Sequence, residues 1–139
     1  MGQQQLLLII LGVIVVGIAV AVGITMFKDN AVSANRDAVT NDLVNLAARA
    51  QQYYRRPTAL GGGQGSFSGI TADISGLRIL TSIPNGTNAN GTYSIISSSV
   101  SSMVIQGTGT ETGNDGTTPV KVVMDVWADS AKVDNTQIN

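Results

Sequence analysis

The feature that most constrains this chain is an apolar run from Leu6 to Phe27 that carries no charged side chain. At ~1.5 Å per residue, a helix of ~20 residues crosses the ~30 Å hydrocarbon core of a bilayer, and this run is long enough. A secretory signal peptide would have a basic N-terminal region and a shorter apolar stretch. A permanent anchor would have Lys or Arg on its cytoplasmic flank, whereas the first charged residue here is Lys28. A third interpretation is a temporary span, in which Gly12, Gly17 and Gly23 let other helices approach closely. Taken alone, scattered glycines in an apolar helix are more simply explained as tolerated.

The same helix is expected to continue beyond the apolar run and to become amphipathic. No proline stands between Leu6 and Arg56, and Pro57 discourages continuation. Apolar residues in the second part recur at steps of three, four and seven, which trace one helix face: Val32, Val39, Leu43, Leu46, Ala50 and Tyr53. We therefore predict a helix that ends near Arg56, although Asn30 and Ser33 are good capping residues and leave a break near Lys28 open.

After Pro57 the composition shifts to Gly, Ser, Thr and Asn with short runs of β-prone residues. Strands are predicted at Tyr93–Ile96, Val100–Ile105 and Val120–Trp127, separated by turn dipeptides such as Asn90-Gly91. These strands would form a small antiparallel meander. A sheet of this size needs a cover on one face, and the apolar stripe of the preceding helix can supply it.

Three residues are candidates for the contact between sheet and helix: Tyr93, Met103 and Trp127. The apolar residues between Ile70 and Ile83 fit a short helix or an extra strand equally well. The predicted fold class is therefore α+β: a long N-terminal helix, hydrophobic and then amphipathic, with a small antiparallel β-sheet domain packed on its second half.

Composition argues against several classes of function. The sequence has no Cys and no His, which excludes disulfides and the usual zinc frameworks. A formal net charge of -1 gives no basic surface for nucleic acid. The glycines of Gly61–Gly65 lack the Gly-Lys-Ser/Thr ending of a phosphate-binding loop, and the spacing of Asp125, Asp129 and Asp134 does not match a calcium loop. We expect no enzyme activity, catalytic residue, metal or cofactor.

Two tripeptides match the acceptor sequence for N-glycosylation, Asn85-Gly86-Thr87 and Asn90-Gly91-Thr92. Chance matches are expected in a chain this rich in Asn and Thr. Asn85 and Asn90 are therefore candidate glycosylation sites on sequence alone.

The layout resembles the type IV pilin superfamily. The resemblance rests on Gly2-Gln3, the apolar stretch from Leu6, the continuous helix to about Arg56 and the small β-domain, and it is therefore specific mainly in the N-terminal half. In that family a prepilin peptidase cleaves after the Gly, the helix waits in the membrane, and a motor-driven machine adds subunits to the base of a filament. The resemblance implies processing between Gly2 and Gln3 and a filament core from Leu6 to Ile24.

The core interface that this resemblance implies consists of Leu6, Leu7, Leu8, Ile9, Ile10, Leu11, Gly12, Val13, Val16, Gly17, Val20, Gly23 and Ile24. Bacterial members usually carry a glutamate near the start of the apolar segment, thought to pair with the terminal amine of a neighbour. Gln3, Gln4 and Gln5 stand there instead, and a leader of Met1-Gly2 would be very short. Register between subunits would then come from packing and from these glutamines.

We accordingly expect three regions: residues 1–27 as membrane span and filament core, residues 28–56 as the amphipathic continuation, and residues 57–139 as the β-rich domain, together the lollipop layout of a pilin. The expected function is a structural subunit of an extracellular helical filament, with a possible role in adhesion or motility. Its partners would be copies of itself, the membrane before assembly, and the assembly machinery with its peptidase. The alternatives are a single-span membrane protein with a small exported binding or sensor domain, and a pseudopilin of a secretion or DNA-uptake machine.

Overall fold

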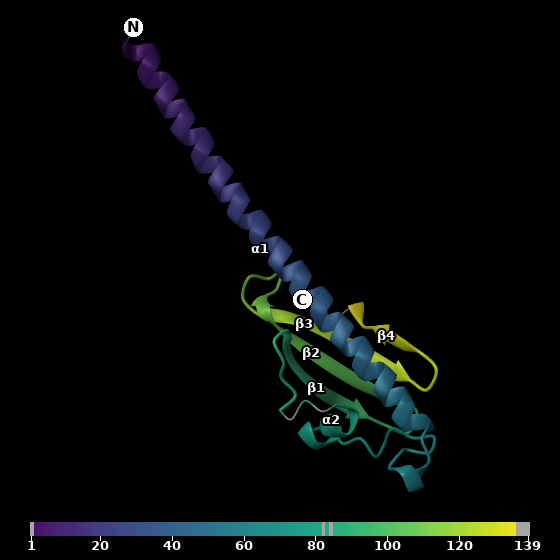
Figure 1. The fold of residues 1–139 in the computed structure, drawn as a ribbon. Helices are drawn as coiled ribbons and strands as arrows, with labels where there is room; N and C mark the ends of the chain where they lie inside the picture. The colour runs from purple at the N-terminus through teal and green to yellow at the C-terminus, as the bar shows by residue number, and fades with distance from the viewer. Residues whose placement is uncertain (1, 82, 84, 136–139) are drawn as a thin grey trace. The chain divides into compact units, whose positions relative to one another are not determined.

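The computed structural model describes residues 2–81, 83 and 85–135. In chain order its elements are α1 (Gly2–Arg55), a 3-10 turn η1 (Thr58–Leu60), α2 (Ile74–Leu80), β1 (Gly91–Ser98), β2 (Ser102–Thr112), β3 (Pro119–Trp127) and β4 (Ala131–Val133). This long N-terminal helix followed by a small antiparallel sheet confirms the predicted α+β fold class (Figure 1). The chain divides into two compact units, Met1–Ala31 and Val32–Asn139, and the division falls inside α1.

The helix α1 is continuous over 54 residues and ends at Arg55, one residue before the predicted end. It passes through Asn30 and Ser33, so the alternative of a break near Lys28 is wrong. The glycine-rich segment that follows folds back on the helix end and satisfies its last carbonyls. The N–H of Gly63 donates to Tyr53 O at 2.8 Å, and that of Gly65 donates to Tyr54 O at 2.7 Å.

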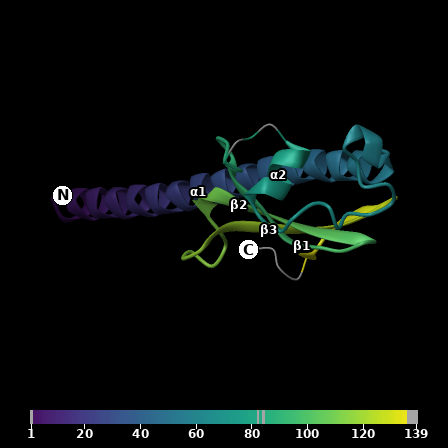
Figure 2. The same cartoon turned by 90° about the horizontal axis from the view of Figure 1, so that it is seen from below.

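The four strands form one sheet in the order β1-β2-β3-β4, with every neighbouring pair antiparallel. In its centre Ile95 of β1 lies opposite Ile105 of β2, which lies opposite Met124 of β3. The part of α1 beyond Ala31 lies on one face of this sheet, so the second unit has a helix layer and a sheet layer (Figures 1 and 2).

The hydrophobic core of the second unit lies between these two layers. The helix contributes the predicted stripe, of which Val39, Leu43 and Ala50 are fully buried and Tyr53 is partly buried. The sheet contributes alternate residues of its three long strands, as expected for a sheet with one covered face. These residues are Tyr93, Ile95, Met103, Ile105, Val120, Val122, Met124 and Val126.

Two glycines in β2 let α1 approach the sheet closely. A Cβ at Gly107 would lie 2.5 Å from Val39 Cγ1, and a Cβ at Gly109 would lie 2.0 Å from Asn35 Oδ1. Both distances are far inside van der Waals contact, so a larger residue at position 107 would displace Val39, and one at position 109 would displace the Asn35 side chain from its hydrogen bonds.

The segment between Ile70 and Ile83, for which the sequence left two alternatives, contains the short helix α2. Asp73 caps it by accepting hydrogen bonds from the N–H groups of Ser75 and Gly76. Leu77 and Leu80 of α2 are buried in the core. Apolar residues at this spacing therefore serve one face of a helix.

Three details of the β-domain differ from the prediction. Trp127 is 37% exposed, because it alternates with the buried Val126 and belongs to the other face of the sheet. The second strand starts at Ser102, not Val100, because Ser99 N and Oγ both donate to Ser102 O and make a tight turn there, and it ends at Thr112, seven residues beyond the predicted end at Ile105. The fourth strand, β4, was not predicted; three residues are too short for a periodic signal.

Candidate functional site

The first candidate site is the apolar part of α1. Every large apolar side chain from Leu6 to Phe27 is between 50% and 78% exposed, with Val22 and Phe27 at the two limits. By length and composition, α1 is the one helix in the described part of the chain that could cross a membrane, a property that secretory signal sequences share. This segment has no cover from its own chain, so its side chains need lipid or another protein.

The surface of this segment has space for a close neighbour. A Cβ built at Gly12, Gly17 or Gly23 would meet no heavy atom within 4 Å. The interface residues expected from the sequence, Leu6 to Ile24, all lie on this segment and are exposed, apart from the partly exposed Gly23. At such glycines a second helix backbone can come nearer than at the surrounding Val and Ile.

The residues expected to flank a processing cut lie at the start of α1. Gly2 is the first helical residue, and Gln3 follows it in the first turn; both are exposed. Met1 lies outside the described residues. Gln4 and Gln5 are also helical and exposed, so three neutral amides precede the apolar run.

A second, polar site surrounds Asp42 in the amphipathic part of α1. Its Oδ2 accepts three hydrogen bonds: from Tyr93 Oη at 2.6 Å, from Asn90 Nδ2 at 2.8 Å and from Asn88 Nδ2 at 2.9 Å. All three donors come from the turn before β1 or from β1 itself, which is 46 to 51 residues away in the sequence. Asp42 therefore fixes that turn to the helix.

The turn is organised internally so that both amides point at the carboxylate. Asn88 Oδ1 accepts hydrogen bonds from the N–H groups of Asn90 at 2.9 Å and Gly91 at 3.1 Å. Two turns earlier on the helix, Asn35 Nδ2 donates to Asn90 O at 2.9 Å, and Asn35 Oδ1 accepts from the N–H of Thr110 at 3.1 Å. Asn35 and Asp42 thus hold the turn at two points.

The environment of Asp42 shifts two pKa values in opposite directions. Partial burial acts to raise the pKa of Asp42, but the hydrogen bonds from Asn90, Tyr93 and Asn88 outweigh it and the pKa lies below its ordinary value of 3.8. Burial of the Tyr93 phenol, together with the hydrogen bond to the Asp42 carboxylate and its negative charge, raises the pKa of Tyr93 well above its ordinary value. Near neutral pH the pair is a carboxylate and a neutral phenol.

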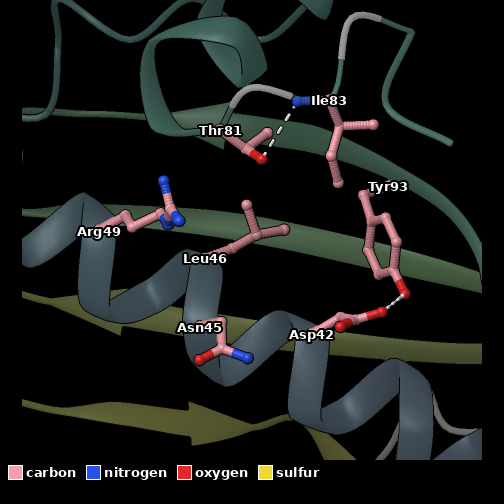
Figure 3. A pocket seen from close by; sticks show the side chains of 7 residues that line it. All are labelled: Asp42, Asn45, Leu46, Arg49, Thr81, Ile83 and Tyr93. Atoms are coloured by element: carbon pink, nitrogen blue, oxygen red, sulfur yellow. Dashed lines mark hydrogen bonds between the residues drawn. The ribbon is translucent and has the colours of Figure 1, made fainter. Parts of the chain in front are cut away.

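A groove of about 370 Å³ opens beside this pair. The helix supplies Asp42, Asn45, Leu46 and Arg49, the segment after α2 supplies Thr81 and Ile83, and β1 supplies Tyr93 (Figure 3). Arg49 Nη1 donates to Leu80 O at 3.4 Å, so the guanidinium is turned toward the end of α2. The groove has a carboxylate near one end, a guanidinium near the other and the apolar Leu46 between them.

The two candidate glycosylation sites have different surroundings. Asn85 is exposed, whereas the amide nitrogen of Asn90 is half-buried and donates to Asp42. An oligosaccharide on Asn90 would have to grow from a nitrogen that is directed at the helix. Of the two, only Asn85 offers an amide at the surface.

Within residues 2–81, 83 and 85–135, no group of three or more Asp or Glu side chains lies close enough to hold a metal ion. Asp115 is exposed, and the hydroxyl of Thr118 with the N–H groups of Thr117 and Thr118 lowers its pKa. It organises the turn between β2 and β3.

Sequence reasoning identified the apolar segment but not the polar site around Asp42. Asp42 was simply one of the charges on the polar side of the helix, and Asn88 and Asn90 belonged to a turn. Hydrogen bonds across more than forty residues leave no local periodic signal. No family model, no curated protein and no solved structure matches this chain.

Proposed function

We propose that this chain is the structural subunit of an extracellular helical filament, held together by the apolar part of α1. The observation that carries the proposal is the exposure of the whole segment from Leu6 to Phe27 in a helix whose second part is covered by its own sheet. Burying one such side chain is worth ~1.5 to 3 kcal/mol, so leaving the segment in water would cost tens of kcal/mol.

A bundle of helices from several copies of the chain removes these side chains from water, as a membrane does. Two features favour the bundle. The glycines at positions 12, 17 and 23 leave open space for neighbouring backbones. The three residues directly before the apolar run, Gln3, Gln4 and Gln5, carry no charge that would fix an orientation in a membrane. The subunit would wait in the cytoplasmic membrane, where a prepilin peptidase cuts between Gly2 and Gln3, and would then move to the cell surface as the assembly machinery adds it to the filament.

The experiment is electron microscopy of surface filaments from cells that express the full chain, compared with two valine variants. Val16 and Val100 are 61% and 63% exposed, one in the apolar part of α1 and one on the β-domain. Val16→Asp should abolish filaments, because a buried carboxylate in the bundle has no partner. Val100→Asp should leave them intact. Wild-type protein that yields only monomers or small complexes in detergent contradicts the proposal.

The groove beside Asp42 favours the alternative of a single-span membrane protein with a small exported binding domain. Its carboxylate and guanidinium ends would suit a small zwitterion. In that case the wild-type chain stays in membranes, no filaments form, and Arg49→Ala lowers the binding of a small-molecule library to the detergent-solubilised protein. A filament subunit needs no such binding.

A further inference from the structure

We propose that the exposed face of α1 in the second unit is a contact between copies of this chain, in which Asp37 of one copy pairs with Arg55 of another. The inference rests on the proposed function, because a filament is what brings parallel copies together. It concerns the axial alignment of neighbouring copies, because the apolar segment has no charged side chain that could fix this alignment.

The sheet covers only one side of α1 beyond Ala31, and the opposite side carries a continuous exposed stripe. The stripe recurs at steps of three and four: Ala34, Asp37, Asn41, Val44, Ala48, Gln52 and Arg55. Between its two charged ends the stripe is uncharged, with small or apolar side chains at Val44 and Ala48. Such a surface allows another helix to lie close.

The charges on the stripe have opposite signs at its two ends. Asp37 and Arg55 are eighteen residues apart, which at 3.6 residues per turn is five whole turns, so both lie on the same line along the helix. Their separation is about 27 Å at 1.5 Å per residue, too far for a pair within one chain. The exposed guanidinium of Arg55 has five N–H donors, of which one on Nη2 donates to Ala128 O, on the turn between β3 and β4, at 3.3 Å.

The stripe of one copy is complementary in charge to the stripe of another copy that is shifted along the helix axis. Because each β-domain blocks the other side of its helix, parallel copies in a filament would turn their exposed stripes toward a common centre. A copy displaced by five turns along the axis then brings its Arg55 level with the Asp37 of its neighbour. A displacement by one turn more or less would separate the charges by about 5.4 Å, so the pair selects one axial offset.

The test is a charge-reversal cycle in cells that express the full chain, with filaments quantified by sedimentation and electron microscopy. Asp37→Arg and Arg55→Asp should each lower filament mass about tenfold, and the double variant D37R/R55D should return it to within about twofold of wild type. Matched controls are Glu111→Arg and Lys132→Asp, which reverse charges of the same signs at exposed positions of β2 and β4. These controls should assemble as wild type does, and Trp127 fluorescence of each variant reports that the β-domain is folded.

Cysteine cross-linking gives an independent measurement, since the sequence contains no Cys. Filaments of D37C/R55C should give a ladder of disulfide-linked oligomers on oxidation, because a disulfide requires Cα atoms within about 7 Å and the two positions of one chain are much farther apart. Filaments of D37C/E111C should give none.

Different results would contradict the proposed function and the Asp37–Arg55 contact. Wild-type protein that makes no filaments contradicts the proposed function. Wild-type filaments with unaffected single reversals, with a double variant as poor as the single ones, or with assembled D37C/R55C that forms no ladder, overturn the Asp37–Arg55 contact and leave the filament in place.

Discussion

The parts of α1 before and after Ala31 have similar aliphatic side chains but bury them in different ways. Val16 is 61% exposed, whereas Val39 is fully buried beneath the sheet. The second part has a cover because the chain returns as strands that lie on it; the first part has none within its own chain. The difference shows that a single helix can bury its apolar side chains in its own domain along one part and leave them exposed along the other.

The largest effect should come from a leucine pair that tests this difference directly. Leu43→Ala removes a fully buried side chain and should lower the free energy of unfolding by about 2 to 5 kcal/mol. Leu11→Ala, at a position 54% exposed, should leave the free energy of unfolding unchanged. Urea unfolding of the full chain in detergent, followed by the fluorescence of its single tryptophan, measures both. Equal losses would mean that the first part also belongs to the folded core.

The second largest loss of stability should come from removing the hydrogen bond between Tyr93 and Asp42. Tyr93→Phe leaves the ring in the core but removes a donor to a carboxylate, so we expect a loss of about 1.5 to 3 kcal/mol. The control is Tyr54→Phe, where the ring packs on Phe67 at 4.7 Å between centroids and little should change. A loss as large in the control would show that ring packing, not the bond to the helix, is being measured.

The pH dependence of stability is a second test of the contact between Tyr93 and Asp42. Because the pKa of Asp42 is lowered on folding, its contribution is present above its ordinary value of 3.8 and is lost as pH falls below it. Because the pKa of Tyr93 is raised, its contribution is present below its ordinary value of 10.0 and is lost as pH rises beyond it. Thermal unfolding from pH 2 to pH 11 should show both losses in wild type. In Tyr93→Phe the alkaline loss should disappear and the acid loss should be smaller.

A glycine pair compares the two helix surfaces. Gly107→Ala places a Cβ 2.5 Å from Val39 Cγ1 and should cost about 1 to 3 kcal/mol. Gly12→Ala meets nothing within 4 Å and should leave the fold unchanged. In the double variant V39A/G107A the losses should be smaller than additive, because the shorter side chain removes the clash. Strict additivity would show that the helix does not lie so close to β2.

The smallest effect is expected from the two asparagines that match the glycosylation sequence. Asn90→Ala removes a hydrogen bond to Asp42 and should cost about 0.5 to 1.5 kcal/mol. Asn85→Ala, at an exposed position, should remain within about 0.5 kcal/mol of wild type. Chemical denaturation of the two variants side by side measures the difference, and a reversed order would contradict the assigned turn.

Periodicity was enough to predict the helix and its covered face. The stripe from Val32 to Tyr53 faces the core, and the predicted end at Arg56 is one residue late, because proline and glycine mark a helix end clearly. The alternation in β3 also holds apart from Val123, which is buried although it lies between the buried Val122 and Met124. Trp127 was expected at the contact with the helix, but its place in the alternation puts it on the other face of the sheet.

The contacts between distant segments could not be predicted in this way. Gly107 and Gly109 lie beyond the predicted strand Val100–Ile105, and nothing in the sequence indicates that a helix lies on them. Asp42 has the sequence context of a solvated charge, and its three donors follow from how the turn before β1 folds over the helix. Such contacts depend on tertiary packing, which local propensity does not encode.

The hydrogen bonds of the turn before β1 also have a consequence for how the chain avoids aggregation. Tyr93 N donates to Gly86 O, Asn88 N donates to Gly91 O, and Thr87 bridges Thr92, so the chain itself occupies the outer side of the first half of β1. The other border of the sheet is β4, three residues long with Lys132 at its middle. Short, charged or covered edge strands discourage the pairing of strands from separate molecules. Copies at high local concentration are therefore less prone to grow amyloid-like sheets from these edges.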